Sequence, residues 1–282
     1  MISIFIKAIS IILHRLYKPV AKTMFYFRFE KRKRQHQLFK YFGFDVVYKK
    51  GDGAVYHISS GYSYEPDVIE AISCHIKQGG VMMDVGSNIG LITLAVLHDN
   101  PTISSYCFEP STYAYQSFQR TIKINHLERS VILSRLGLWN RAQTLTFHTH
   151  GINNALGDGV HDTKRAGTAE KIKIQTTTLD AYIKRHAIKK VDLIKVDVEG
   201  AEKMVLEGAV DTIRAFHPVI IFEANPVNLK AYSLLPDDIY DFFDGTLNYN
   251  IYSLDQKRLK KEDFVKITKK IDNYMGVFNA KS

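Results

Sequence analysis

Val81-Met82-Met83-Asp84-Val85-Gly86-Ser87-Asn88-Ile89-Gly90 is the stretch that decides the fold of this 282-residue chain. It joins an apolar run with one embedded acid to a loop that holds two glycines, and the apolar residues of 91–97 follow directly. A buried strand, a tight turn and the first turns of a helix have this order. The stretch therefore predicts an α/β fold with a ligand site at the carboxyl end of its first central strand.

The glycine loop indicates which ligand the site accepts. A dinucleotide site needs the pattern G-x-G-x-x-G, but Asn88 and Leu91 stand at its second and third glycine positions. No Gly-Lys-Ser/Thr follows either, so the phosphate loop of nucleotide triphosphatases is excluded. A carboxylate at Asp84 repels phosphates and favours a cation. The loop therefore favours S-adenosylmethionine, which carries an ammonium and a sulfonium and no phosphate.

The composition supports one large domain with an additional segment. Hydrophobic residues make up 45% of the chain, enough to bury one sizeable core. The formal net charge is +9, and residues 14–50 hold a large share of it, including the run Lys31-Arg32-Lys33-Arg34. Such a run is usually a solvated surface and can also contact anionic lipid. No nucleic-acid recognition motif is present, so we expect no nucleic-acid partner.

Residues 1–29 have the pattern of an amphipathic helix. Lys7 and His14-Arg15 interrupt its apolar run before it reaches the ~20 residues of a membrane-spanning helix. Two interpretations stay open: residues 1–34 lie on an anionic membrane surface, or the helix docks on the protein itself. We expect a cytoplasmic protein, attached to the inner face of a membrane under the first interpretation.

The rest of the chain alternates between strand and helix patterns. A loop over residues 150–170 is long for a compact domain and predicts a lid over the substrate. Two short runs, 44–48 and 54–58, are expected to pair with each other. Further strands are expected at residues 103–108, 131–133, 145–149, 172–177, 191–196, 218–222, 250–254 and 274–278.

Acidic residues follow several of these strands. Glu109 lies 25 positions after Asp84 at the end of a strand, where it can accept the hydroxyls of a ribose. The alternative is that Glu109 caps the helix that begins near Pro110. Asp197 ends a strand that should lie beside the first one, so it faces the glycine loop across the topological switch point. Trp139 follows the third strand, where an adenine ring could rest.

In this order and spacing, the motifs resemble the FkbM family of S-adenosylmethionine-dependent methyltransferases. The resemblance covers roughly residues 60–280 and implies a Rossmann-like, mostly parallel seven-stranded sheet with an antiparallel last strand. It also implies methyl transfer to a hydroxyl oxygen of a sugar, glycan or other small molecule. We therefore expect an N-terminal amphipathic, basic helical extension over 1–45 and the methyltransferase domain over 46–282. The motifs are Asp84–Gly90, Phe108–Pro110, Thr178–Asp180, Ile194–Glu202 and Phe222–Glu223.

The resemblance also implies roles for individual residues. The loop would pass around the methionine end of the cofactor, Asp84 would hold its ammonium, and Glu109 its ribose. Glu65 would close over the cofactor, with a helix N-terminal charge as the alternative. Ser87 stands where family members often have alanine, a mild departure. The expected cofactor-binding residues are Glu65, Asp84, Gly86, Ser87, Asn88, Gly90, Glu109, Pro110 and Trp139.

Methyl transfer to an alcohol needs a group that takes the hydroxyl proton. Asp197 is the first candidate for this base and Glu199 the second, whereas Glu202 is assigned a structural role. We expect no metal, although Asp197, Glu199 and Glu223 could form a divalent-cation site. Two other functions compete: a membrane-associated binding protein with an inactive methyltransferase-like domain, and a nicotinamide-dependent oxidoreductase, which the missing glycines disfavour.

Overall fold

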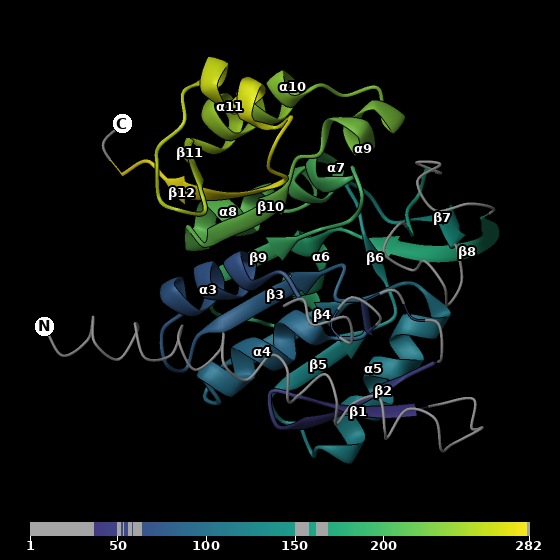
Figure 1. Ribbon diagram of the computed structural model, residues 1–282. Helices are drawn as coiled ribbons and strands as arrows, with labels where there is room; N and C mark the ends of the chain where they lie inside the picture. Colours follow the sequence, from purple (N-terminus) through teal and green to yellow (C-terminus); the bar gives the residue numbers. More distant parts are fainter. Residues whose placement is uncertain are drawn as a thin grey trace, which may run out of the picture.

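The computed structural model describes residues 37–49, 52, 54–55, 58, 64–149, 158–161 and 169–280. Within these residues the chain forms a seven-stranded sheet with helices on both faces, and two smaller sheets (Figure 1). The strands of the large sheet are β3 (Val81–Val85), β4 (Ser104–Phe108), β5 (Val131–Ser134), β9 (Leu193–Val196), β10 (Val219–Glu223), β11 (Tyr249–Ser253) and β12 (Asn273–Phe278).

The strand order of the large sheet is β11-β12-β10-β9-β3-β4-β5. Strands β3, β4, β5, β9 and β10 are parallel, and β12 is antiparallel to both of its neighbours. The chain winds outward from β3 through β4 to β5 and then returns to β9 on the other side of β3. The carboxyl ends of β3 and β9 therefore form a topological switch point, where open α/β sheets bind their ligands. The expected mostly parallel sheet with an antiparallel last strand is confirmed.

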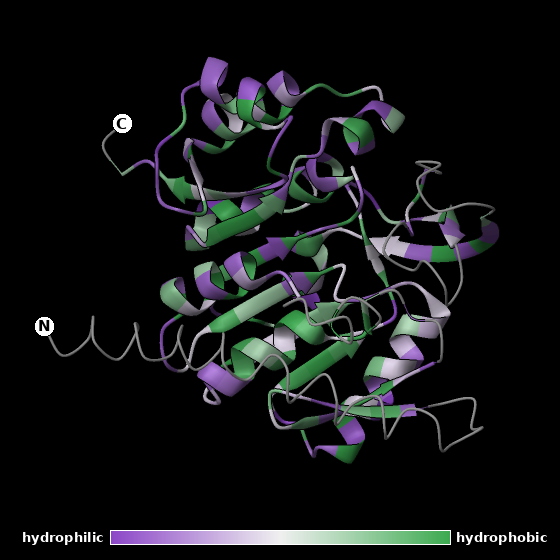
Figure 2. Ribbon diagram, viewed as in Figure 1, coloured by the Kyte–Doolittle hydropathy of each residue, from purple (hydrophilic) through white to green (hydrophobic). Residues whose placement is uncertain are grey.

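Two hydrophobic cores lie on the two faces of the sheet. Because side chains alternate along a strand, Met82 belongs to one core, whereas Met83 and Val85 belong to the other. Figure 2 shows that the central strands are mainly hydrophobic. Helices α3 (Pro66–His75), α4 (Leu91–Asp99) and α5 (Thr112–Ile124) contribute to the first core. The helices that contribute to the second core are α6 (Leu179–Arg185), α7 (Glu202–Glu207), α8 (Val210–Phe216), α9 (Pro226–Ala231), α10 (Pro236–Asp241), the π-helix η2 (Phe242–Leu247) and α11 (Lys261–Ile267).

Glycine is required at two positions of the loop between β3 and α4. Gly86 has a φ of +77°, and a Cβ there would lie 1.9 Å from the carbonyl oxygen of Asp197. Gly90 has a φ of +88°, and a Cβ there would lie 2.1 Å from the Phe118 ring. Both conformations are strained for residues with a side chain. The two glycines thus let the loop pass closely between β9 and α5.

The described residues before α3 form a hairpin, which corrects the expected strand pairing. Strand β2 (Phe44–Tyr48) pairs with β1 (Gln37–Tyr41), and Ala54 and Val55 of the expected partner segment are helical. The amide of Val47 donates to Thr121 Oγ1 of α5 at 2.9 Å, so contacts with a distant helix fix this hairpin. Residues 37–41 are therefore strand and not the end of a helical extension.

Two other expectations fall mainly outside the described residues. The amphipathic helix expected within residues 1–34 lies outside them, as do most of residues 150–170. Among the residues that are described, we find no helix long and apolar enough to cross a membrane. The remaining small sheet consists of β6 (Gly137–Leu138), β7 (Gln143–Thr149) and β8 (Glu170–Thr177), in the order β6-β8-β7.

Candidate active site

A cavity of about 310 Å³ lies at the carboxyl ends of β3, β4, β9 and β10. Its volume falls within the roughly 300–1,000 Å³ of small-molecule sites. The parallel strands bring together residues that are far apart in the sequence, because each strand delivers the residues at its end to the same edge of the sheet. Seven of the predicted site residues line this cavity: Glu65, Gly86, Asn88, Glu109, Pro110, Asp197 and Glu199.

Glu109 is held rigidly beside the glycine loop. Its Oε2 accepts a hydrogen bond from the amide of Asn88 at 3.0 Å, and its Oε1 accepts one from the amide of Ser111 at 2.7 Å. The second bond lies at the start of α5, so the capping role weighed for Glu109 is compatible with a ligand role. Each carboxylate oxygen keeps a further lone pair for a ribose hydroxyl. Burial raises the pKa of Glu109 to about 7.

Asp84 does not line the cavity. Its side chain is fully buried, and Oδ2 accepts a hydrogen bond from Thr93 Oγ1 of α4 at 2.7 Å. Its Oδ1 lies 3.4 Å from Lys195 Nζ. The carboxylate thus turns into the α4 layer, because residue 84 is on the same face of β3 as Met82. This arrangement does not support the expected contact between Asp84 and the cofactor ammonium.

Lys195 contacts the buried Asp84, the glycine loop and Asp197. No role for this lysine was expected from the sequence. Its Nζ donates to the carbonyl of Gly86 at 3.0 Å and lies 3.6 Å from Asp197 Oδ2. Burial lowers the pKa of Lys195. The carboxylates of Asp84, Asp197 and Glu65 raise the pKa by more than burial lowers it, so the pKa lies above its ordinary value. The charged form of the side chain is therefore favoured. The sequence pattern that could have indicated this role is a single lysine within the apolar strand 193–196, because a buried charge in a central strand needs a partner of opposite charge.

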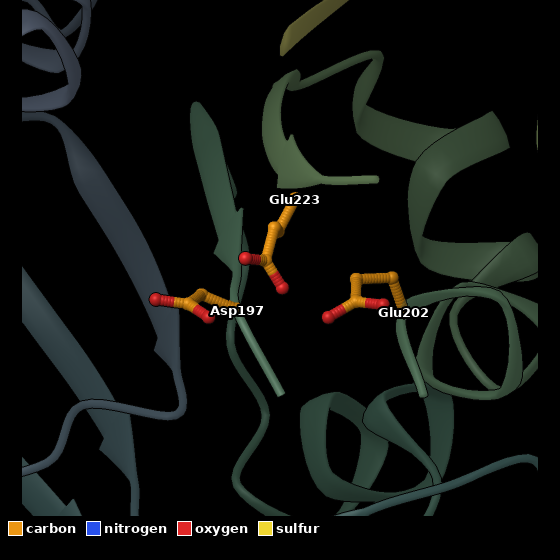
Figure 3. A group of neighbouring side chains, drawn as sticks. All are labelled: Asp197, Glu202 and Glu223. Atoms are coloured by element: carbon orange, nitrogen blue, oxygen red, sulfur yellow. The ribbon is translucent and has the colours of Figure 1, made fainter. Parts of the chain in front are cut away.

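The ends of β9 and β10 gather four acids. Asn228 Nδ2 donates to Glu199 Oε2 at 2.8 Å and to Glu223 Oε2 at 2.9 Å. Oε1 of Glu202 accepts the amides of Val198 at 3.0 Å and Gly200 at 3.2 Å, in agreement with a structural role. One oxygen each of Asp197, Glu202 and Glu223 lies within 4.8 Å of the others (Figure 3). The cation site weighed from the sequence included Glu199; the structure groups Glu202 with the other two instead.

The cavity is strongly acidic although the whole chain is basic. Its described lining contains no Lys, Arg or His. Burial raises the pKa of Glu65 to about 7, with Asp197 adding to the effect. Burial also raises the pKa of Glu223, and repulsion from Asp197, Glu202 and Glu199 raises it further. Such a site favours cationic ligands and opposes a pyrophosphate. The acids in its lining are Glu65, Glu109, Asp158, Asp197, Glu199 and Glu223.

The other predicted residues lie around this cavity. Trp139 lines an adjoining, mainly apolar cavity that shares Gly86, Pro110 and Phe147 with the first one. Ser87 lines a small neighbouring cavity together with Lys195. Gly90 packs against Phe118 and acts through the backbone of the loop.

Comparison with known proteins identifies the family. A family model of the methyltransferase FkbM domain matches residues 84–251, more than half of the chain. The chain belongs to the FkbM methyltransferase family. The matched region includes the glycine loop, Glu109 and the acids after β9 and β10, which build most of the cavity.

Individual relatives match part of the chain. The hexuronic acid methyltransferase AglP of Haloferax volcanii is 28% identical over 157 residues, covering 56% of this chain and 61% of that protein. Methyltransferase 1 of Beauveria bassiana is 28% identical over 145 residues, covering 46% and 58%. The crystal structure of methyltransferase FkbM from Methylobacillus flagellatus has a TM-score of 0.44 at 14% identity, covering 72% of this chain and 44% of that one. The chain spans 58 to 61% of the length of the curated relatives it matches.

S-adenosylmethionine is the cofactor of this FkbM protein, and the donor set fits it. The acidic lining matches its two positive groups. Ser87 Oγ and Asn88 Oδ1 are buried without a hydrogen-bond partner among the described residues, so both can bind a ligand that reaches the loop. The apolar cavity beside Trp139 has the character that an adenine ring needs.

Proposed function

We propose that this FkbM protein transfers the methyl group of S-adenosylmethionine to a hydroxyl oxygen of a sugar, glycan or other small molecule. The observation that carries the proposal is the placement of two carboxylates in one cavity. Glu109, which follows β4, would hold the cofactor ribose, and Asp197, which follows β9, lines the same cavity. The cavity that both residues line is where the methyl donor and the acceptor would meet.

The protein's own contribution to this reaction is positioning and proton removal. When bound, S-adenosylmethionine supplies an electrophilic methyl carbon and leaves as S-adenosylhomocysteine. The loop fixed by Glu109 and Lys195 would orient it, so that the acceptor oxygen meets the methyl carbon in line. Asp197 would take the hydroxyl proton as the new O–C bond forms. Glu199 lines the same cavity and is the second candidate for this base.

The acidic lining also limits which groups of the acceptor can enter the cavity. The name of the Haloferax volcanii relative specifies a hexuronic acid, which supports a sugar acceptor here. A carboxylate of the acceptor would be repelled if it entered the cavity, since the described lining offers no basic side chain. The part of the acceptor that reaches the reacting centre is therefore a neutral or cationic hydroxyl-bearing face.

A transfer assay tests this function. The full-length chain is incubated with S-adenosylmethionine labelled in its methyl group and with neutral sugars, amino sugars, uronic acids and lipid-linked glycans. We expect label in an O-methyl ether of a sugar, and mass spectrometry and NMR locate the methylated atom. Exclusive labelling of nitrogen or carbon, or of an acceptor without a hydroxyl, would contradict the proposal.

Replacing Glu109 by glutamine should weaken cofactor binding about 10- to 100-fold. A hydrogen bond to a charged group contributes about 1.5–3 kcal/mol, and the amide cannot accept at both former oxygens. Isothermal titration calorimetry with S-adenosylmethionine measures the change, with the exposed Glu70→Gln on α3 as the matched control. NAD should give no binding heat. Unchanged affinity in the Glu109 variant would remove this residue from the ribose site.

Cofactor affinity should also fall at acidic pH. The ionised Glu109 accepts hydroxyl protons, and its pKa of about 7 means that it is protonated progressively below pH 7. Affinity is expected to decrease by up to about tenfold per pH unit there and to level off above pH 8. Glu65 has a pKa of about 7 as well, so the double variant Glu65→Gln/Glu109→Gln should show a flat profile. A slope that persists in the double variant would assign the pH dependence to other groups.

We further propose that an N-terminal extension precedes the methyltransferase domain. Its boundary, expected at residue 45, moves to before the hairpin of β1 and β2, because that hairpin is bonded to α5. Contact of residues 1–34 with an anionic membrane surface is a third proposal. Their support is the amphipathic, basic pattern of the sequence. We expect the full chain to float with anionic vesicles. We expect the protein that lacks residues 1–29 to remain folded but no longer to float with them. Equal flotation of the shortened chain would refute the membrane contact.

A further inference from the structure

The acids at the ends of β9 and β10 carry more negative charge than their neighbours compensate. Lys195 lies near Asp197, but it is already shared with the buried Asp84. Glu202 and Glu223 form no ion pair with any described residue. Strands β9 and β10 bring Asp197 and Glu223 together because their last ladder pair, Val196 and Phe222, directly precedes these two residues.

Glu202 supplies an independent sign that a ligand belongs here. Its side chain is 1% exposed, and while Oε1 accepts two backbone amides, Oε2 is buried without a hydrogen-bond partner among the described residues. A buried oxygen without a partner is costly. In Figure 3 the Glu202 carboxylate faces Glu223, with Asp197 on the far side of Glu223. The Glu202 carboxylate thus points into the cluster.

We propose that Asp197, Glu202 and Glu223 together bind one divalent cation of the Mg²⁺, Mn²⁺ or Ca²⁺ type at the wall of the cavity. Hard divalent cations prefer carboxylate oxygens. Two ligand oxygens on opposite sides of an ion are about 4.6–5.2 Å apart for Ca²⁺ and about 4.0–4.2 Å for Mg²⁺. The observed spread of up to 4.8 Å fits the larger ion directly, and the smaller one after a modest approach of the side chains.

Burial selects an inorganic ion over a cationic group of the acceptor. Asp197 and Glu223 line the cavity, whereas Glu202 lies behind them and is almost fully enclosed. A bare ion can reach all three carboxylates, but an ammonium attached to a sugar cannot. An ion held in this way keeps coordination positions open toward the cavity for water or for the acceptor hydroxyl.

The catalytic role of the ion rests on the proposed function, but its binding does not. A metal-bound hydroxyl loses its proton more easily, because the ion stabilises the negative charge on oxygen. The proton would still leave to the oxygen of Asp197 that does not bind the ion. The reaction balance is therefore unchanged: the O–H bond breaks, the O–CH₃ bond forms, and the sulfonium becomes a thioether.

Direct metal binding tests the inference without reference to activity. Chelator-treated full-length protein is titrated with Mn²⁺, and the free ion is followed by its EPR signal. We expect one equivalent to bind with a dissociation constant of about 10⁻⁴ M or lower, and Mg²⁺ or Ca²⁺ to compete. Glu202→Gln and Glu223→Gln should each weaken binding at least tenfold. Glu207→Gln, the same change on the same helix, should leave it unchanged.

Two results would overturn the site: no stoichiometric Mn²⁺ binding to the folded protein, or equal binding in the Glu202 and Glu223 variants. Thermal unfolding at pH 8 provides a second measurement. Glu202→Gln removes a buried charge, so its metal-free Tm should equal or exceed that of the unchanged protein while the Mn²⁺-dependent increase disappears. Calorimetry with S-adenosylmethionine separates the two proposals, since cofactor binding without Mn²⁺ binding rejects only the metal site.

Discussion

Replacing Asp197 by asparagine should lower kcat by about 10²-fold or more, while S-adenosylmethionine still binds. The asparagine amide has nearly the shape of the carboxylate but cannot take a proton from the acceptor hydroxyl. Asp197 lines the cavity, and its side chain is 26% exposed, so an acceptor can reach it. Single-turnover transfer with saturating cofactor measures the change, and calorimetry checks that the cofactor site is intact.

Glu199→Gln is the matched comparison for this base. Glu199 lines the same cavity, but its Oε2 already accepts the amide hydrogen of Asn228. We expect its replacement to lower kcat less than about tenfold. A large loss in Glu199→Gln together with near-normal turnover in Asp197→Asn would exchange the two roles.

Because Asp197 is also a proposed metal ligand, its variant needs one further measurement. Mn²⁺ affinity is determined in the same preparation of Asp197→Asn. Lost turnover at saturating Mn²⁺ assigns the loss to proton removal. Turnover that returns as Mn²⁺ is raised would instead show that Asp197 acts by holding the ion.

Replacing Lys195 by methionine should destabilise the protein by about 3–5 kcal/mol. Removing one partner of a buried ion pair leaves the other charge uncompensated, and Asp84 is fully buried. The loop would also lose the bond from Lys195 to the Gly86 carbonyl. For a chain of this size the change corresponds to a decrease in Tm of roughly 6–20 °C, which differential scanning calorimetry detects.

Two controls make the Lys195 result specific. Lys190→Met removes an exposed pair with Asp192, which contributes less than about 1 kcal/mol. The double variant Asp84→Asn/Lys195→Met removes both buried charges and should recover a large part of the lost stability. Equal stability of the single and double variants would show that Lys195 does not act by compensating Asp84.

Local patterns in the sequence were enough to predict the strands of the large sheet. The apolar runs expected at residues 103–108, 131–133, 191–196, 218–222, 250–254 and 274–278 became strands of this sheet close to their expected positions, and the residues that follow the parallel ones lie at one edge. Glu109 and Asp197 could be found in this way because a parallel sheet delivers the ends of its strands to the same side. The glycine loop was equally readable, since its conformation depends on residues that are adjacent in the chain.

Contacts between distant segments could not be predicted. Strand β2 pairs with β1, which was not the partner expected from the sequence, and its backbone also bonds to Thr121 of α5 and to Asn125 directly after that helix. Asp84 looked like a ligand-binding acid until its neighbour was known. In the β3–β9 ladder its partner is Lys195, and residues opposite each other in a parallel pair project to the same face. The side chain therefore meets a cation inside the protein, and its contact with the cofactor ammonium stays a prediction.

By itself, the sequence determined the elements, their order and the acids at the strand ends, because turn chemistry and hydrophobic period act over a few residues. Only the tertiary structure decided which of these acids line the cavity and which are buried beside it. Asp84 pairs with Lys195 in the core, whereas Glu202 and Glu223 converge on the cavity wall from α7 and β10 and form no ion pair with any residue that the structure describes. That outcome depends on strand register and on the burial of charge, and both are properties of segments that meet only in the folded chain.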